Sequence, residues 1–105
     1  MAIFIMLMRL AHGVLRSPEQ LEKLEKEVVE RTEKELGKAV SWRANSAVLG
    51  PRDYRDIFEA ADIEVAMKVS TIVRTFGHAH TEVWPATEWQ RFKEIVRQLP
   101  GGNGD

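Results

Sequence analysis

Two of the three histidines lie two positions apart, His78 and His80, in a segment that runs into Trp84-Pro85. Residues two apart on a β-strand face the same way, so both imidazoles share one face of a strand expected over His78–Trp84. Imidazole is a common metal ligand, and its charge changes near neutral pH. The pattern points to a metal or acid–base centre in which His12 is the third candidate ligand.

A structural interpretation of the same histidines stays open. Same-face neighbours on a strand are ~7 Å apart, a spacing less distinctive than that of a helical metal motif. Under this interpretation, His78 caps the preceding turn, His80 hydrogen-bonds across an interface and His12 is a solvated loop residue. Any histidine chemistry depends on what the surrounding elements bring near these side chains.

The first half of the chain predicts three strands and one helix. A short, nearly unbroken apolar row over Met1–Leu10 favours a strand. Ser17-Pro18 is typical of a helix start, and Gly37 is the expected helix end. Strands over Ala39–Leu49 and Tyr54–Ala60, joined by the turn at residues 50–53, then form a hairpin.

The second half predicts two more helices around one strand. Asp62 is the expected N-cap of a helix that Gly77 ends, and the next strand runs to Trp84, where Pro85 is expected to break it. A capping box at Thr87–Gln90 predicts a last helix. Its apolar stripe consists of Trp89, Phe92, Val96 and Leu99.

The resulting order, β-α-β-β-α-β-α, predicts an α+β, ferredoxin-like fold with a C-terminal helix. Helices cover one face of its antiparallel sheet, and the first and third strands are central. Yet the first strand is apolar on both sides, because Ile3, Ile5 and Leu7 alternate with Phe4, Met6 and Met8. We therefore expect a second copy to cover the helix-free face, giving a sheet-to-sheet homodimer or a higher homo-oligomer.

This topology gathers several polar side chains at one mouth of the sheet. The third and fourth strands run antiparallel to the first, so their starts lie near its end. The sequence thus predicts a ligand-binding group with a basic, an acidic, a phenolic and two imidazole side chains: Arg9, Asp53, Tyr54, His78 and His80. A small molecule is the expected ligand.

Composition limits the classes of partner. The 15 Lys and Arg nearly balance the 16 Asp and Glu, which argues against nucleic acid or an acidic membrane as partner. The chain has no cysteine and no segment apolar enough to span a bilayer, so we expect a cytoplasmic protein. Residues 1–99 form the expected single domain, and residues 100–105 a disordered tail.

The sequence resembles the GYD domain family of bacteria and archaea. The resemblance rests on Gly50 and Asp53, the strand Asp56–Ala60, Phe76-Gly77-His78, and residues 81–87. It implies the dimeric α/β-barrel fold, with no agreed activity, and the wider superfamily implies room for a small ligand. Arg52 stands where the Gly-x-Tyr-Asp pattern has tyrosine.

Two hypotheses about function follow. The first is a homo-oligomeric protein that binds a small molecule or metal at a histidine-containing pocket near the sheet mouth. The alternative is a structural self-assembly module without catalytic activity. No sequence motif identifies a cofactor or a reaction.

Overall fold

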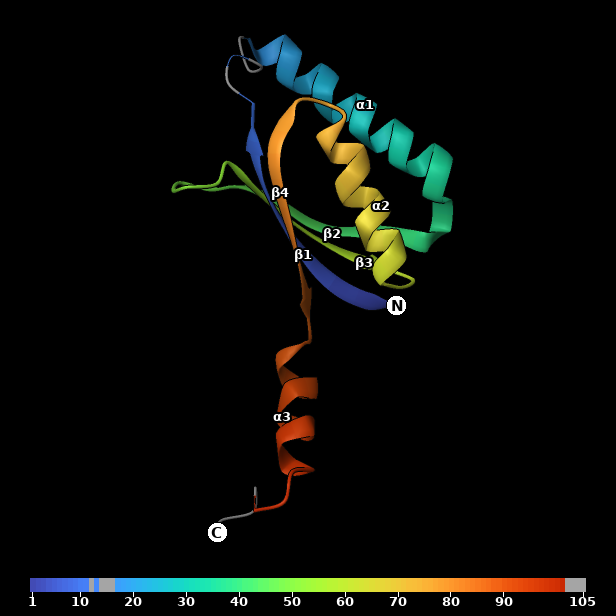
Figure 1. The fold of residues 1–105 in the computed structure, drawn as a ribbon, viewed down its shortest axis with the longest axis vertical. Coiled ribbons are helices and arrows are strands. Elements are labelled where there is room, and N and C mark those ends of the chain that lie inside the picture. The colour runs from blue at the N-terminus through green and yellow to red at the C-terminus, as the bar shows by residue number, and fades with distance from the viewer. Residues whose placement is uncertain (12, 14–16, 102–105) are drawn as a thin grey trace.

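The computed structural model describes residues 1–11, 13 and 17–101 of the chain. Two helices, α1 and α2, lie against one face of a four-stranded sheet, and a third, α3, stands beyond the end of β4 (Figure 1). In chain order the elements are β1 (Ala2–Leu10), α1 (Pro18–Leu36), a 3₁₀ turn (Gly37–Ala39), β2 (Val40–Ala47), β3 (Tyr54–Ala60), α2 (Ile63–Arg74), β4 (His78–Ala86) and α3 (Trp89–Arg97).

The sheet has the strand order β2-β3-β1-β4, and each neighbouring pair is antiparallel. This is the ferredoxin-like arrangement that the sequence predicts, with β1 and β3 in the centre. The prediction of the fold class is therefore confirmed.

The core lies between the sheet and α2. Phe4, Met6 and Met8 on β1 and Phe58 on β3 are buried on this side. The rings of Phe4 and Phe58 stack with their centroids 5.7 Å apart. From α2, Ala66, Val69 and Val73 complete the core.

The opposite, helix-free face of the sheet is also apolar along its middle. Ile3, Ile5 and Leu7 point there, because they alternate with the buried residues of β1. The strand register sets Ile5 beside Ile57 of β3 and Trp84 of β4. Trp84 is 50% exposed, so this face carries a partly solvated apolar strip.

Local signals set both ends of α1 and the start of α2. The Ser17 hydroxyl accepts a hydrogen bond from the Gln20 backbone N–H at 3.3 Å, and the Asp62 carboxylate accepts one from Val65 at 2.9 Å. Gly37 follows α1 with φ of +52°, a conformation that favours glycine. These caps agree with the sequence-based expectations.

Pro85 does not end β4, contrary to the expectation from the sequence. The strand continues to Ala86, and Pro85 pairs in register with Phe4. Within the described residues β4 pairs only with β1, so it is an edge strand, the position in a sheet where proline is accommodated.

The predicted capping box of α3 is not formed. The helix begins at Trp89, and its N-cap is Glu88, whose side chain makes no capping hydrogen bond. Thr87 therefore lies one residue too early to cap the helix.

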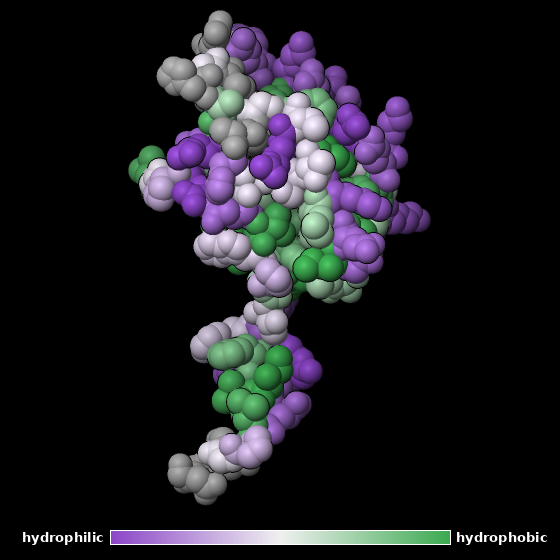
Figure 2. Space-filling model, in the orientation of Figure 1, coloured by the Kyte–Doolittle hydropathy of each residue, from purple (hydrophilic) through white to green (hydrophobic). Residues whose placement is uncertain are grey.

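α3 projects away from the two packed layers (Figure 1). Its large apolar residues are all exposed, among them Trp89 at 67% and Phe92 at 45%, and they gather along one side of the helix (Figure 2). Residues 102–105 of the expected tail lie outside the described part of the chain. Within that part, no helix has the length and apolarity to cross a membrane.

Candidate functional site

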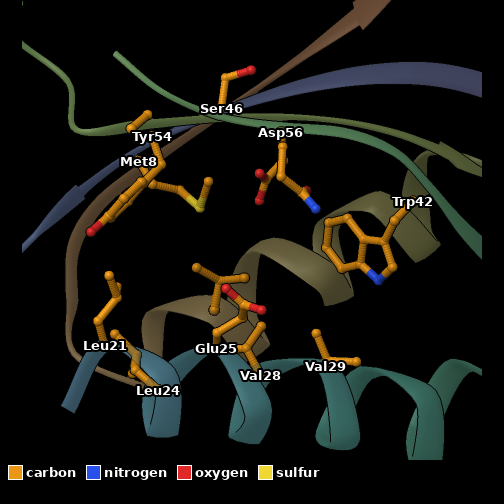
Figure 3. Close-up of a pocket in the computed structure, with 13 residues that line it drawn as sticks. Met8, Leu21, Leu24, Glu25, Val28, Val29, Trp42, Ser46, Tyr54 and Asp56 are labelled. Atoms are coloured by element: carbon orange, nitrogen blue, oxygen red, sulfur yellow. The ribbon is translucent and has the colours of Figure 1, made fainter. Parts of the chain in front are cut away.

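A cavity of about 360 Å³ lies between α1 and the sheet (Figure 3). One wall is the side of α1 that faces the sheet, and the other is formed by β1, β2 and β3, with α2 at the back. The lining residues are Met8, Leu21, Leu24, Glu25, Val28, Val29, Trp42, Asn45, Ser46, Ala47, Tyr54, Asp56 and Val73.

The cavity exists because α1 packs closely only along its C-terminal half. Thr32 is buried, whereas Leu21, Leu24 and Val28, nearer the start of the helix, are only partly buried. These residues form the apolar stripe of the helix. Val28 packs against the edge of the core, whereas Leu21 and Leu24 line the cavity. An apolar surface in this position is available to a ligand.

Two carboxylates enter the cavity from opposite walls. Asp56 points from β3 toward α1, and Glu25 points from α1 toward the sheet (Figure 3). Burial, and second the negative charge of Glu25, raise the pKa of Asp56 to about 6. The Asn45 amide, with its nitrogen toward β3, donates to Asp56 Oδ1 at 2.8 Å.

The remaining wall is apolar and aromatic. Trp42 closes one end of the cavity and Tyr54 the other, and burial followed by the charge of Asp53 raises the pKa of the Tyr54 phenol. Among the described residues that line the cavity there is no lysine, arginine or histidine. Its charged groups are thus both acidic, and burial disfavours the negative charge of Asp56.

Of the predicted ligand-binding residues, Tyr54 lines this cavity and Asp53 lies next to it. Asp53 ties β1 to the hairpin, because its Oδ2 accepts a hydrogen bond from the Leu10 N–H at 2.9 Å and its own N–H donates to Met8 O at 2.9 Å. These bonds give Asp53 a structural role, and its role in ligand binding stays a prediction.

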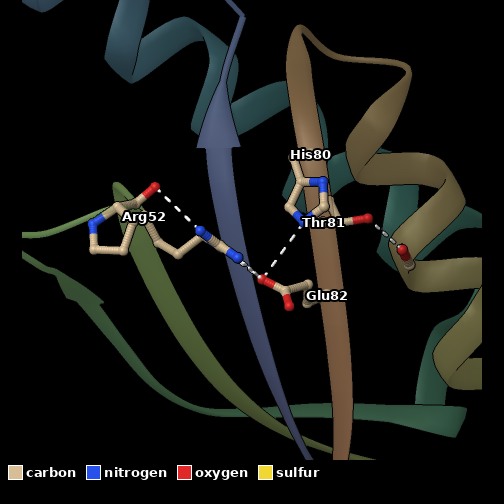
Figure 4. Close-up of polar contacts among 6 residues, drawn as sticks. Arg52, His80, Thr81 and Glu82 are labelled. Atoms are coloured by element: carbon tan, nitrogen blue, oxygen red, sulfur yellow. Dashed lines mark hydrogen bonds and ion pairs between the residues drawn. The ribbon is translucent and has the colours of Figure 1, made fainter.

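Arg9 and His80 lie on the other side of the sheet. They are neighbours in the pairing of β1 with β4, on the helix-free face. His80 Nε2 is 3.4 Å from Glu82 Oε2, and Arg52 Nε and Nη2 each lie 2.5 Å from the same oxygen (Figure 4). The hydrogen bond from Arg52 lowers the pKa of Glu82.

The sheet therefore separates the predicted group into two sites. Tyr54 faces the cavity, whereas Arg9 and His80 face outward with Glu82. Arg52, which replaces the tyrosine of the Gly-x-Tyr-Asp pattern, is an ion-pair partner in this outer cluster.

The predicted metal ligands are only partly described. His12 and the side chain of His78 lie outside the described part of the structure, and the His78 backbone pairs with Leu10 at the start of β4. In the described part, no group of three or more His, Cys, Asp or Glu residues could hold a metal ion. Metal binding by His12, His78 and His80 stays a prediction.

The sequence-based set did not include Glu25 and Asp56. Glu25 follows Leu21 by four residues and precedes Val28 by three, so it interrupts the apolar stripe of α1. Asp56 has the same parity on β3 as the buried Phe58 and Ala60. In both cases, the signal in the sequence was an acidic residue at a position that the periodic pattern assigns to the side facing the core.

Two solved structures share the fold of this chain. The structure of At3g17210 from Arabidopsis thaliana has a TM-score of 0.52 at 16% identity, and the match covers 84% of this chain and 95% of that one. Protein Atu4242 from Agrobacterium tumefaciens has a TM-score of 0.53 at 17% identity, with 83% and 92% covered. At these identities the similarity is one of fold alone.

A family match extends over most of the sequence. No curated protein matches it significantly. The GYD domain, however, matches residues 4–96, which include all the residues described for the cavity and the outer cluster. The chain therefore belongs to the GYD domain family.

Proposed function

We propose that this protein is a homodimeric small-molecule-binding protein whose ligand occupies the cavity between α1 and the sheet. The observation that carries the proposal is an apolar cavity, large enough for a small organic molecule, with Asp56 and Glu25 pointing into it. A pocket with apolar walls and few polar groups is the usual form of such a site.

The charged groups in the cavity determine which charge a ligand should carry. A carboxylate shielded from water and facing a second one is stabilised by a proton or by a positively charged neighbour. A ligand with an apolar body and a protonated amine supplies that charge, and its ammonium group can bond to Asp56. Trp42 offers an aromatic ring for the apolar body or for a cation–π contact.

A second copy on the helix-free face accounts for the apolar strip there. Ile3, Ile5 and Leu7 are partly solvated, and Trp84 adds half of an indole surface. Charged side chains surround the strip, among them the Arg43–Glu59 pair and the Arg52–Glu82 pair. An apolar centre with a polar rim is typical of a protein interface.

The second candidate function is a self-assembly module without catalytic activity. The exposed apolar strip and α3 favour it, because both support association whether or not the cavity binds a ligand.

Calorimetric titration with octylamine, octanol and octanoate at pH 8 tests the ligand chemistry. We expect octylamine to bind roughly tenfold or more tightly than octanol, because a charge-assisted hydrogen bond is stronger than a neutral one. Octanoate, repelled by both carboxylates, is expected to bind weakest. Asp56→Asn should remove the preference for the amine and retain the binding of octanol.

Glu82→Gln is the matched control, since Glu82 is a carboxylate on the opposite face of the sheet. It should leave all three affinities unchanged. Equal affinities for amine and alcohol would contradict the proposed ligand class. No binding of any of the three compounds would favour the assembly module.

A further inference from the structure

Within the described part of the chain, α3 is an amphipathic helix whose apolar side stays exposed. Four large apolar side chains lie on one side of it and are exposed to solvent, namely Trp89, Phe92, Ile95 and Val96, and the exposed Leu99 follows shortly after its end. The Trp89 and Phe92 rings contact each other, with centroids 5.4 Å apart, but α3 stands clear of the sheet and of α1 and α2 (Figure 1).

A helix of this kind requires a packing surface to be stable. α3 has nine residues, and isolated helices shorter than about 12 to 15 residues are marginal in water. Its N-cap residue makes no side-chain hydrogen bond that would compensate. The stability of α3 must therefore come from burial of its apolar side.

We propose that α3 packs against a second copy of this chain, as an arm that crosses from one subunit to the other. The inference rests on the homodimer proposed above and adds a contact to it. Only Thr87 and Glu88 separate β4 from α3, so the helix continues outward from the same strand that carries Trp84 on the helix-free face. α3 thus carries a second exposed apolar surface beyond the end of the strand that borders the apolar strip.

The exposed apolar area of α3 is of a size that suits a dimer contact. Trp89 is 67% and Phe92 45% exposed, and rings of this size can each bury roughly 150 to 250 Å². The two rings add on the order of 200 Å² per copy, and twofold symmetry doubles that gain. A standard interface buries about 1,600 Å² in total, so the arms would supply a substantial part of it.

The charges of the helices also favour a second copy. The polar side of α3 carries Arg91, Lys93 and Arg97 against one acid, Glu94. α1 carries seven glutamates and four basic residues over its length. Copies of this chain therefore carry one acidic and one basic helix each, and these opposite charges favour association of two copies over repulsion at long range.

Hydrogen exchange of α3, measured with the subunit mass over a dilution series, tests the proposal on the full chain. We expect the α3 amides to be protected where the protein is a dimer and to lose protection where dilution yields the monomer. Phe92→Glu should weaken the dimer at least tenfold and remove the protection of α3. Gln90→Glu, which places the same charge on the polar side, should do neither.

Three results would overturn the proposal. Protection of α3 in the monomer would mean that the helix folds back on its own chain. A dimer with unprotected α3 amides would leave the sheet-face dimer intact but remove the arm. A monomer at every concentration would remove both. Ligand binding by Asp56 is measured separately and does not depend on any of these outcomes.

Discussion

Asp56 is the residue on which the proposed chemistry depends. It is held at an inward position by β3, faces Glu25 across the cavity, and has a pKa raised to about 6. Because burial is the first cause of that shift, the charged form costs the folded protein free energy unless a cation is bound. The charged carboxylate is therefore a source of instability, which the cationic ligand that we propose would relieve.

Replacement of Asp56 by asparagine should stabilise the ligand-free protein in a pH-dependent way. The pKa is higher in the folded state than the ordinary value of 3.8, so the native protein loses stability as the pH rises through about 6. We expect Asp56→Asn to raise the free energy of unfolding at pH 8 by about 1 to 2 kcal/mol, since partial solvation reduces the full effect. The gain should vanish below pH ~4.

Urea denaturation at a fixed protein concentration, repeated across this pH range, measures the effect. Glu22→Gln, on the exposed side of α1, is the control and should change the stability little at any pH. A destabilised Asp56→Asn variant at pH 8 would show that the carboxylate is held by favourable contacts instead.

The sequence identified some site residues and missed others for a physical reason. Alternation along a strand is a local signal, and in the structure His80 lies on the same face of β4 as Glu82 and Trp84. Alternation alone does not reveal whether a residue near a strand end lies on the helix-covered or the helix-free face of the sheet. In the structure, Tyr54 lies on the helix-covered face and His80 on the helix-free face. Glu25 reaches the cavity only because α1 packs over the sheet, and that packing depends on the whole fold.

At the scale of the elements, the caps determine where helices begin. Asp62 bonds to the Val65 N–H at 2.9 Å at the start of α2, whereas Glu88 at the start of α3 makes no such side-chain bond. α2 also contributes Ala66, Val69 and Val73 to the core, so its stability affects the whole sheet. Within the described chain, α3 has neither a side-chain capping bond nor a residue in the core.

Asp62→Ala should therefore cost about 1 kcal/mol of stability, the usual value for a lost N-cap. Glu88→Ala is the matched control and should change stability by only a few tenths of that amount, because no capping bond is lost. Thermal or urea unfolding at one protein concentration provides both values. Equal losses in the two variants would contradict the assignment of the caps.

The order and type of the elements were predictable because their signals are local. Ser17, Gly37 and Asp62 act within one turn of the helix ends that they set. The extent of β4 was not predictable in the same way. Pro85 is tolerated because β4 is an edge strand, and that depends on the order of strands in the assembled sheet.

At the scale of the whole molecule, the two faces of the sheet have different proposed roles. One face, with α1 and α2, encloses the core and the cavity, and the other presents an apolar strip rimmed by ion pairs. The sequence predicts that both faces of β1 are apolar, which the structure confirms. The sequence predicts a pocket, but with histidines and near the sheet mouth; its position under α1 was not predictable, because it arises where α1 and the sheet diverge. The direction of α3 was not predictable either, since its apolar stripe suits any packing surface.

Native mass spectrometry of the untagged protein with octylamine tests both roles of the sheet at once. We expect twice the subunit mass of 12.0 kDa with one amine per copy. Ile5→Glu, which charges the helix-free face, should give a monomer that still retains one amine, because the cavity lies within a single chain. A native protein that is monomeric, or a dimer that retains no amine, would contradict the account.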